Sequence, residues 1–177
     1  MLSGCVSNGA GCPTHTSDSA GLPEVVVNVR AERTSIGCST VRVEYTDPAL
    51  LHPLQYTLSL WLSAGVETRF LLVQTAEVSP LSDCTISVTS GTLRPNYDGW
   101  ASWKGDGSLG CQVEIDEWVI YDWRVLGDVR IYNTLAHELG HCLRLPHSSD
   151  SQSFMESSGS GSLLLQSDVL QLSSFKG

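Results

Sequence analysis

Three histidines and one glutamate lie close together late in the sequence, as His137, Glu138, His141 and His147. On a helix, positions i and i+4 share one face, so His137 and His141 can direct their imidazoles at one point in space. Glu138 then lies beside that point. A carboxylate placed there can accept a proton from a water held by a metal ion, which is the chemistry of the H-E-x-x-H arrangement. The pattern therefore predicts a catalytic zinc site with Glu138 as the general base.

His147 completes the predicted ligand set from outside the helix. It is too far from His141 to share its helical face, and Pro146 predicts that the helix has already ended. We therefore expect the chain to turn back and deliver His147 as the third ligand. Three neutral imidazoles leave the fourth tetrahedral position of Zn²⁺ open for water, which is typical of catalytic rather than structural sites.

The two helical histidines need a helix with an apolar face against the rest of the domain. Asp128 is a suitable N-cap. Ile131, Leu135, Leu139 and Cys142 recur at the spacing of an apolar stripe. We expect this stripe to face a sheet and to leave the histidines on the other side.

The remaining periodicity predicts a sheet with helices against it. Residues 40–45 alternate between apolar and polar side chains, as in a half-buried strand. Leu54, Leu58, Trp61 and Leu62 recur as an amphipathic helix that ends near Gly65. Further strands are expected at 24–29, 68–77, 85–89 and 113–120, a long loop at 91–112, and a short last helix that Ser167 and Asp168 cap.

Length and charge limit the classes of protein. The 177 residues suit one domain, and 10 basic against 19 acidic residues give a net charge of −9. Such a charge disfavours nucleic acid and anionic membranes as partners. No apolar run has transmembrane length. The sequence contains no oligomerisation signal, so we expect a monomer.

The six cysteines indicate an exported protein with disulfide bonds. Six cysteines allow about 15 connectivities, and we expect Cys84 to pair with Cys111. Cys142 points roughly 100° away from the neighbouring ligand on the helix, so it should pack or form a disulfide rather than bind metal.

Residues 1–23 are rich in Ser, Gly, Thr and Pro and are expected to form a flexible leader. Within them, Leu2 to Cys5 resembles the lipobox of bacterial lipoproteins, in which the cysteine is acylated. An ordinary leader of small residues is the alternative. Cys5 is thus a candidate lipid anchor and the one membrane contact that we expect. The predicted location is extracellular, at the cell surface or periplasmic.

Residues 134–158, TLAHELGHCLRLPHSSDSQSFMESS, resemble the metzincin clan of zinc endopeptidases, most closely the matrixins or matrix metalloproteinases. The resemblance implies that the three histidines bind zinc, that Glu138 is the general base and that Met155 is the methionine beneath the metal. Arg144 departs from the family, which has Gly in a left-handed turn at this position. A non-Gly residue in that conformation costs about 1 kcal/mol.

The same resemblance implies an α+β fold. Residues 24–177 would form a single metzincin-like domain with a twisted mixed sheet and two long helices. The zinc helix would run along the cleft, and a small C-terminal subdomain would hold the Met-turn and the final helix. Residues 99–118 are similar to the matrixin edge strand, glycine loop and following strand. By resemblance, Ala101, Ser102 and Trp103 would bind an extended substrate by β-augmentation; simple packing is the alternative role for Trp103.

Two other metal sites of the family can be considered. Glu114 stands where a histidine of the structural zinc site would be, so we do not expect a second zinc. Asp98, Asp106, Asp116 and Glu117 are hard oxygen ligands, but their spacing is not that of an EF-hand. A Ca²⁺ site and a solvated acidic loop both remain open.

The predicted function is zinc-dependent hydrolysis of peptide bonds in protein substrates. One alternative is a gluzincin-type site with Glu156 as the third ligand. Another is a non-catalytic, zinc-stabilised binding module such as a surface lipoprotein, which would have no use for Glu138.

Overall fold

The part of the chain that the structure describes is nearly continuous from residue 34 to residue 157. The computed structural model describes residues 3–4, 24–25, 34–80, 82–103, 109–157, 161, 163–164, 168 and 171. Cys5, Asp106, most of residues 1–23 and most of the expected last helix lie outside this set.

A six-stranded mixed sheet forms the centre of the described part, in the order β1-β6-β7-β5-β3-β4. Strands β3, β4, β5 and β7 run parallel to one another, whereas β6 is antiparallel to β7 and to β1. A separate parallel pair joins β2 to β8. The bounds are β1 Ser3–Gly4, β2 Glu24–Val25, β3 Thr34–Tyr45, β4 Val66–Gln74, β5 Thr85–Gly91, β6 Gly99–Trp103, β7 Cys111–Asp116 and β8 Leu163–Leu164.

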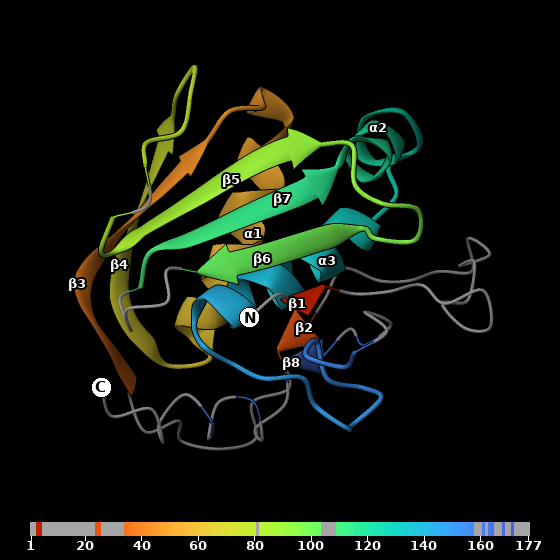
Figure 1. The fold of residues 1–177 in the computed structure, drawn as a ribbon. Coiled ribbons are helices and arrows are strands. Elements are labelled where there is room, and N and C mark those ends of the chain that lie inside the picture. Colours follow the sequence, from red (N-terminus) through yellow and green to blue (C-terminus); the bar gives the residue numbers. More distant parts are fainter. Residues whose placement is uncertain are drawn as a thin grey trace.

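Two helices of equal length cover one face of this sheet (Figure 1). They are α1, Leu51–Ser63, which follows the 3-10 turn η1, Pro48–Leu50, and α3, Arg130–Cys142. Trp61 of α1 and Tyr132 of α3 are among the largest fully buried side chains. The α+β class, the mixed sheet and the two long helices are therefore confirmed. Among the described residues, no helix has the length and apolarity needed to cross a membrane.

Helix α1 forms where the apolar spacing predicts it. Leu54, Leu58 and Trp61 are buried, but Leu62 is 43% exposed, so the buried stripe is narrower than expected. Gly65 follows the helix with a φ of +99°, a conformation that glycine adopts without steric cost.

Helix α2, Glu117–Leu126, is a departure from the expected elements. We expected a strand through Ile120, but β7 ends at Asp116, where the helix begins. The Asp116 carboxylate accepts a hydrogen bond from Trp118 N at 2.8 Å, which is an N-cap. Gly127 closes the helix with a φ of +70°. The apolar residues after Asp116 form a run short enough for a strand. They form a helix instead, because caps at both ends stabilise it.

The expected disulfide between Cys84 and Cys111 is wrong. The structure pairs Cys38 with Cys84 and Cys111 with Cys142. Cys111 is fully buried in β7, and Cys142 lies at the end of α3, which packs against that strand. Their sulfurs therefore meet between sheet and helix. The expectation that Cys142 bridges rather than binds metal is confirmed.

Peptide mapping under non-reducing conditions should recover a fragment that joins Cys111 to Cys142. The double variant Cys111→Ser, Cys142→Ser should lower the free energy of unfolding by about 3–4 kcal/mol, because the bond closes a loop of 31 residues. Denaturant titration measures this loss, with the Cys38→Ser, Cys84→Ser pair for comparison. A fragment that joins Cys84 to Cys111 would contradict the structure.

A buried carboxylate ties the loop after β4 to β3. Glu44 is 1% exposed, and it accepts hydrogen bonds from Ser79 N at 2.7 Å and from Arg42 Nε at 2.6 Å. The hydrogen bond from Ser79 N, followed by that from Arg42, lowers the pKa of Glu44 below its usual value. The folded state therefore favours the ionised form.

The Glu44→Gln variant should lose about 1–3 kcal/mol of stability at pH 7, because a carboxylate accepts stronger hydrogen bonds than an amide. A lowered pKa contributes stability above the unfolded pKa near 4.5, and that contribution disappears as pH falls through the folded pKa. Urea unfolding at several pH values should show the gap between wild type and variant closing below about pH 4.5. A gap that stays constant with pH would contradict this account.

Candidate metal centre

Helix α3 carries the first two candidate ligands and is anchored along its whole length. The expected N-cap at Asp128 is wrong by one residue, because Val129 occupies the N-cap position and has no side-chain cap. Asp128 Oδ1 accepts a hydrogen bond from Arg130 N at 2.8 Å from the position before it. The apolar stripe is buried as expected: Ile131, Leu135, Leu139 and Cys142 are at most 1% exposed. The helix contacts β6, β7 and α1, and the Cys111–Cys142 bond fixes its C-terminal end.

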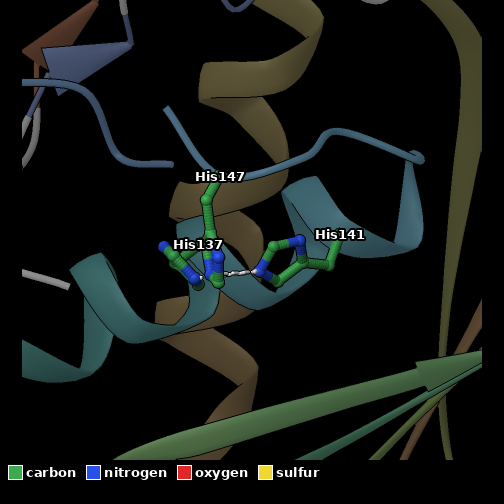
Figure 2. A group of neighbouring side chains, drawn as sticks. All are labelled: His137, His141 and His147. Atoms are coloured by element: carbon green, nitrogen blue, oxygen red, sulfur yellow. Dashed lines mark hydrogen bonds between the residues drawn. The ribbon is translucent and has the colours of Figure 1, made fainter. Parts of the chain in front are cut away.

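The three predicted histidine ligands meet at one point (Figure 2). His141 Nε2 lies 3.0 Å from His137 Nε2 and 3.2 Å from His147 Nε2. In Figure 2, His147 descends from the segment after α3 towards the two helical rings. Among the described residues, this is the one group of three His, Cys, Asp or Glu side chains whose ligand atoms could hold a metal ion.

Backbone carbonyls determine which ring nitrogen of each helical histidine faces this point. His137 Nδ1 donates to Phe154 O at 2.5 Å, and His141 Nδ1 donates to Leu145 O at 2.8 Å. A neutral imidazole that donates from Nδ1 carries its lone pair on Nε2. Both Nε2 lone pairs therefore point into the same small space, where they repel each other unless a cation lies between them.

The spacing of the nitrogens fits Zn²⁺. Zinc–imidazole bonds of about 2.0–2.1 Å at tetrahedral angles place ligand nitrogens roughly 3.3 Å apart. The observed separations of 3.0 and 3.2 Å are close to that value. The donor set and the convergent lone pairs thus match a three-histidine zinc site.

Burial keeps the ligands in the neutral form that a metal requires. It lowers the pKa of His137 to about 3, with the nearby His141 as the second cause, and it lowers the pKa of His141 to about 4. Burial also lowers the pKa of His147, although its ring is more accessible. Near neutral pH no proton competes strongly for the site.

A turn after α3 returns the chain towards the site. Arg144 N donates to His141 O, and Leu145 N donates to Gly140 O, which together form a Schellman motif. Arg144 has a φ of +73°, the left-handed conformation expected from the resemblance. The turn places Leu145 O on His141 Nδ1 and directs the following residues towards His147.

Arg144 keeps this conformation without glycine and also contacts the sheet edge. Its guanidinium carbon lies 5.3 Å from the ring centroid of Trp103, a cation–π geometry. Such a contact contributes about 0.5–1 kcal/mol at an accessible site, which offsets most of the cost of the left-handed backbone. The departure from the family pattern therefore leaves the turn intact.

Glu138 lies beneath the start of β6. It is fully buried, and neither carboxylate oxygen has a hydrogen-bond partner among the described residues. Burial raises its pKa well above the usual value. A Cβ added at Gly99 would lie 3.0 Å from Glu138 Cγ and 2.7 Å from Thr134 Cγ2, so β6 passes this closely only because position 99 is glycine. A buried carboxyl with a raised pKa is typical of acid–base sites.

Met155 packs beneath the helical ligands. It is 1% exposed, and a Cβ added at Gly140 would collide with its sulfur. Its thioether therefore lies against the backbone of α3 immediately before His141. This placement agrees with the predicted apolar floor; that role stays a prediction.

The three predicted substrate residues on β6 differ in accessibility. Ala101 is fully buried, so its side chain faces the core, whereas Ser102 and Trp103 are half-buried. The outer edge of β6 is paired with β1, in the register Ser3 with Ala101 and Gly4 with Trp100. A short segment of the chain itself thus lies where an extended substrate was expected.

The other candidate ligands serve other contacts. Asp116 Oδ2 accepts from Leu93 N at 3.0 Å while Oδ1 caps α2. Asp98 lies 3.7 Å from the guanidinium of Arg130. Asp106 lies outside the described residues, so a calcium site stays a prediction. Glu156 is not a member of the histidine group, and the geometry favours the three-histidine set over the gluzincin alternative.

Residues that sequence reasoning missed support the segment below the ligands. Ser153 Oγ donates to Asp168 Oδ1 at 2.8 Å and accepts from Met155 N at 2.9 Å. The Ser-x-Met spacing is an available signal, since a serine hydroxyl often accepts from the backbone two residues later. No local pattern connects Ser153 to Asp168, which the sequence marks only as a helix cap.

Comparison with known proteins adds little to the geometry. No family model matches the chain, and no curated protein is similar to it. One solved structure that the fold resembles is archaemetzincin from Methanopyrus kandleri, at 14% identity and a TM-score of 0.47. The match covers 82% of this chain and 97% of that chain. A likeness this distant leaves the site geometry to carry the assignment.

The His147→Ala variant should bind zinc more than about 100-fold more weakly than wild type, because it removes one of three ligands rather than an outer-sphere partner. Chelator competition measures the affinity, and metal analysis of the wild type should give one zinc per chain. The Glu156→Gln variant is the control and should bind zinc nearly as wild type does. Normal affinity in His147→Ala with weak binding in Glu156→Gln would favour the gluzincin arrangement.

Proposed function

We propose that this protein is a zinc-dependent endopeptidase of the metzincin type that hydrolyses peptide bonds in protein substrates. The observation that carries the proposal is the convergence of the imidazole nitrogens of His137, His141 and His147. On the same helix, Glu138 is buried and has no hydrogen-bond partner within the described part of the chain. A purely structural zinc site has no need for such a carboxylate, which is costly to bury.

Different residues of the chain have different roles in this reaction. His137, His141 and His147 hold the metal. When bound, Zn²⁺ supplies a Lewis acid that polarises a carbonyl oxygen and lowers the pKa of water to about 7. Met155 forms an apolar floor rather than a ligand, because a thioether is a poor zinc donor beside three imidazoles.

Glu138 is the general base. Its carboxylate accepts the proton of the attacking water and passes it to the leaving amine. A carboxylate near a cation has a lower pKa, so zinc would counter the burial that raises the pKa of Glu138 in the metal-free chain. The group can then exchange a proton near neutral pH, which acid–base catalysis requires.

The substrate binds in an extended conformation along β6, where it takes the place of Ser3–Gly4. The antiparallel pairing of Ser3–Gly4 with Trp100 and Ala101 supports this, since it demonstrates that the outer edge of β6 accepts main-chain hydrogen bonds. Ala101 contributes only its backbone, because its side chain is buried. Ser102 and Trp103 extend the same edge towards Arg144. The assignment to matrixins in particular rests on the sequence resemblance of residues 99–118 and 134–158.

The protein acts as a monomer outside the cytoplasm. Two disulfides within one domain support export, because such bonds persist in oxidising compartments. Lipidation at Cys5 would hold it at a cell surface. The net charge of −9 argues against nucleic acid as a partner.

The Glu138→Gln variant should bind one zinc with nearly normal affinity but cleave casein or a mixed peptide library about 10²–10⁴-fold more slowly, because it keeps the shape of the side chain and removes the base. The matched control is Glu77→Gln at an exposed position after β4, which should retain full activity. Bound zinc without any cleavage that depends on Glu138 would instead indicate the zinc-stabilised binding module.

A further inference from the structure

The two histidines on α3 donate to backbone carbonyls that lie at very different distances along the sequence. Leu145 O, which accepts from His141, belongs to the Schellman turn that follows directly from α3. Phe154 O, which accepts from His137, lies 17 residues away in sequence, in the segment that contains Met155. The orientation of His137 therefore depends on how firmly that distant segment is held.

Ser153 connects the Phe154 segment to a buried carboxylate. Its hydroxyl donates to Asp168 Oδ1 and Oδ2 at 2.8 and 2.9 Å, and the same oxygen accepts from Met155 N at 2.9 Å. A backbone bond from Glu156 N to Ser153 O closes the turn at 3.0 Å. Phe154 thus lies inside a turn that begins at Ser153. The hydroxyl and the carbonyl of Ser153 both form hydrogen bonds that hold this turn.

The burial of Asp168 indicates that this connection has a purpose beyond forming a turn. Ser153 is fully buried and Asp168 is 1% exposed. A serine turn forms without any carboxylate, and a buried carboxylate is costly unless hydrogen bonds compensate for it. The Ser153 hydroxyl lies within hydrogen-bond distance of both carboxyl oxygens of Asp168, so Asp168 holds this hydroxyl in one rotamer.

We propose that Ser153 and Asp168 are positioning residues for the first zinc ligand: their hydrogen bonds fix the turn that presents Phe154 O to His137 Nδ1. The inference rests on the proposed zinc site but does not require peptidase activity. Outer-sphere partners of this kind typically change metal affinity by about 10–100-fold.

The first test measures zinc affinity by chelator competition on the full chain. Ser153→Ala should weaken zinc binding roughly 10-fold or more, and Asp168→Asn, which keeps the volume and one acceptor, by a smaller factor. The controls are Ser151→Ala and Asp150→Asn, both at exposed positions of the same segment, and they should bind zinc within about twofold of wild type. Should Ser153→Ala fail to fold, the comparison of Asp168→Asn with Asp150→Asn decides.

A second readout separates positioning from a general loss of stability. In the NMR spectrum of the zinc-loaded protein, the Nδ1 proton of His137 should shift or exchange faster in Ser153→Ala. The corresponding proton of His141, held by the independent Leu145 turn, should stay unchanged. Equal effects on both protons, or lower thermal stability with normal zinc affinity, would overturn the inference. Loss of peptidase activity alone would leave it standing, because zinc binding is measured directly.

Discussion

The hydrogen bonds from His137 Nδ1 and His141 Nδ1 to backbone carbonyls are the interactions on which the rest of the site depends. Each bond selects the tautomer that leaves a lone pair on Nε2, and each restricts rotation of the ring. Helical spacing alone brings two imidazoles to one face, but it leaves their tautomers and tilt undetermined. The segments after α3 provide that restriction, so the fold beyond the helix is part of the metal site.

The surrounding structure can be understood as support for these two bonds. The disulfide to β7 holds the C-terminal end of α3, where the His141 turn begins. The close passage of β6 over Glu138, which Gly99 permits, keeps that carboxylate away from water. Met155 fills the space against Gly140, so the backbone of α3 is packed against the segment that holds His137. The candidate ligands, Glu138 and Met155 therefore belong to one packed unit.

The burial of Glu138 lowers the stability of this unit, and it is also the observation that says most about function. A fully buried carboxyl without a hydrogen-bond partner among the described residues lowers the stability of a fold. Other buried carboxylates here are compensated: Glu44 by Ser79 and Arg42, and Asp168 by Ser153. The contrast supports the role proposed for Glu138, because local structural rules are typically broken at functional sites.

The sequence by itself determined the features that depend on neighbouring residues. Helical spacing placed His137, Glu138 and His141, Pro146 marked the end of the helix, and Arg144 adopted the left-handed turn that the resemblance implied. Tertiary structure decided what depends on distant contacts. It set the cysteine pairing, because sulfur partners are chosen by how sheet and helix pack. It also brought Asp168 to Ser153 and Phe154 to His137, since hydrogen bonds across 15 and 17 residues leave no periodic trace in a sequence. The helix at residues 117–126 is a different case, because its caps at Asp116 and Gly127 are local signals that the expected strand did not take into account.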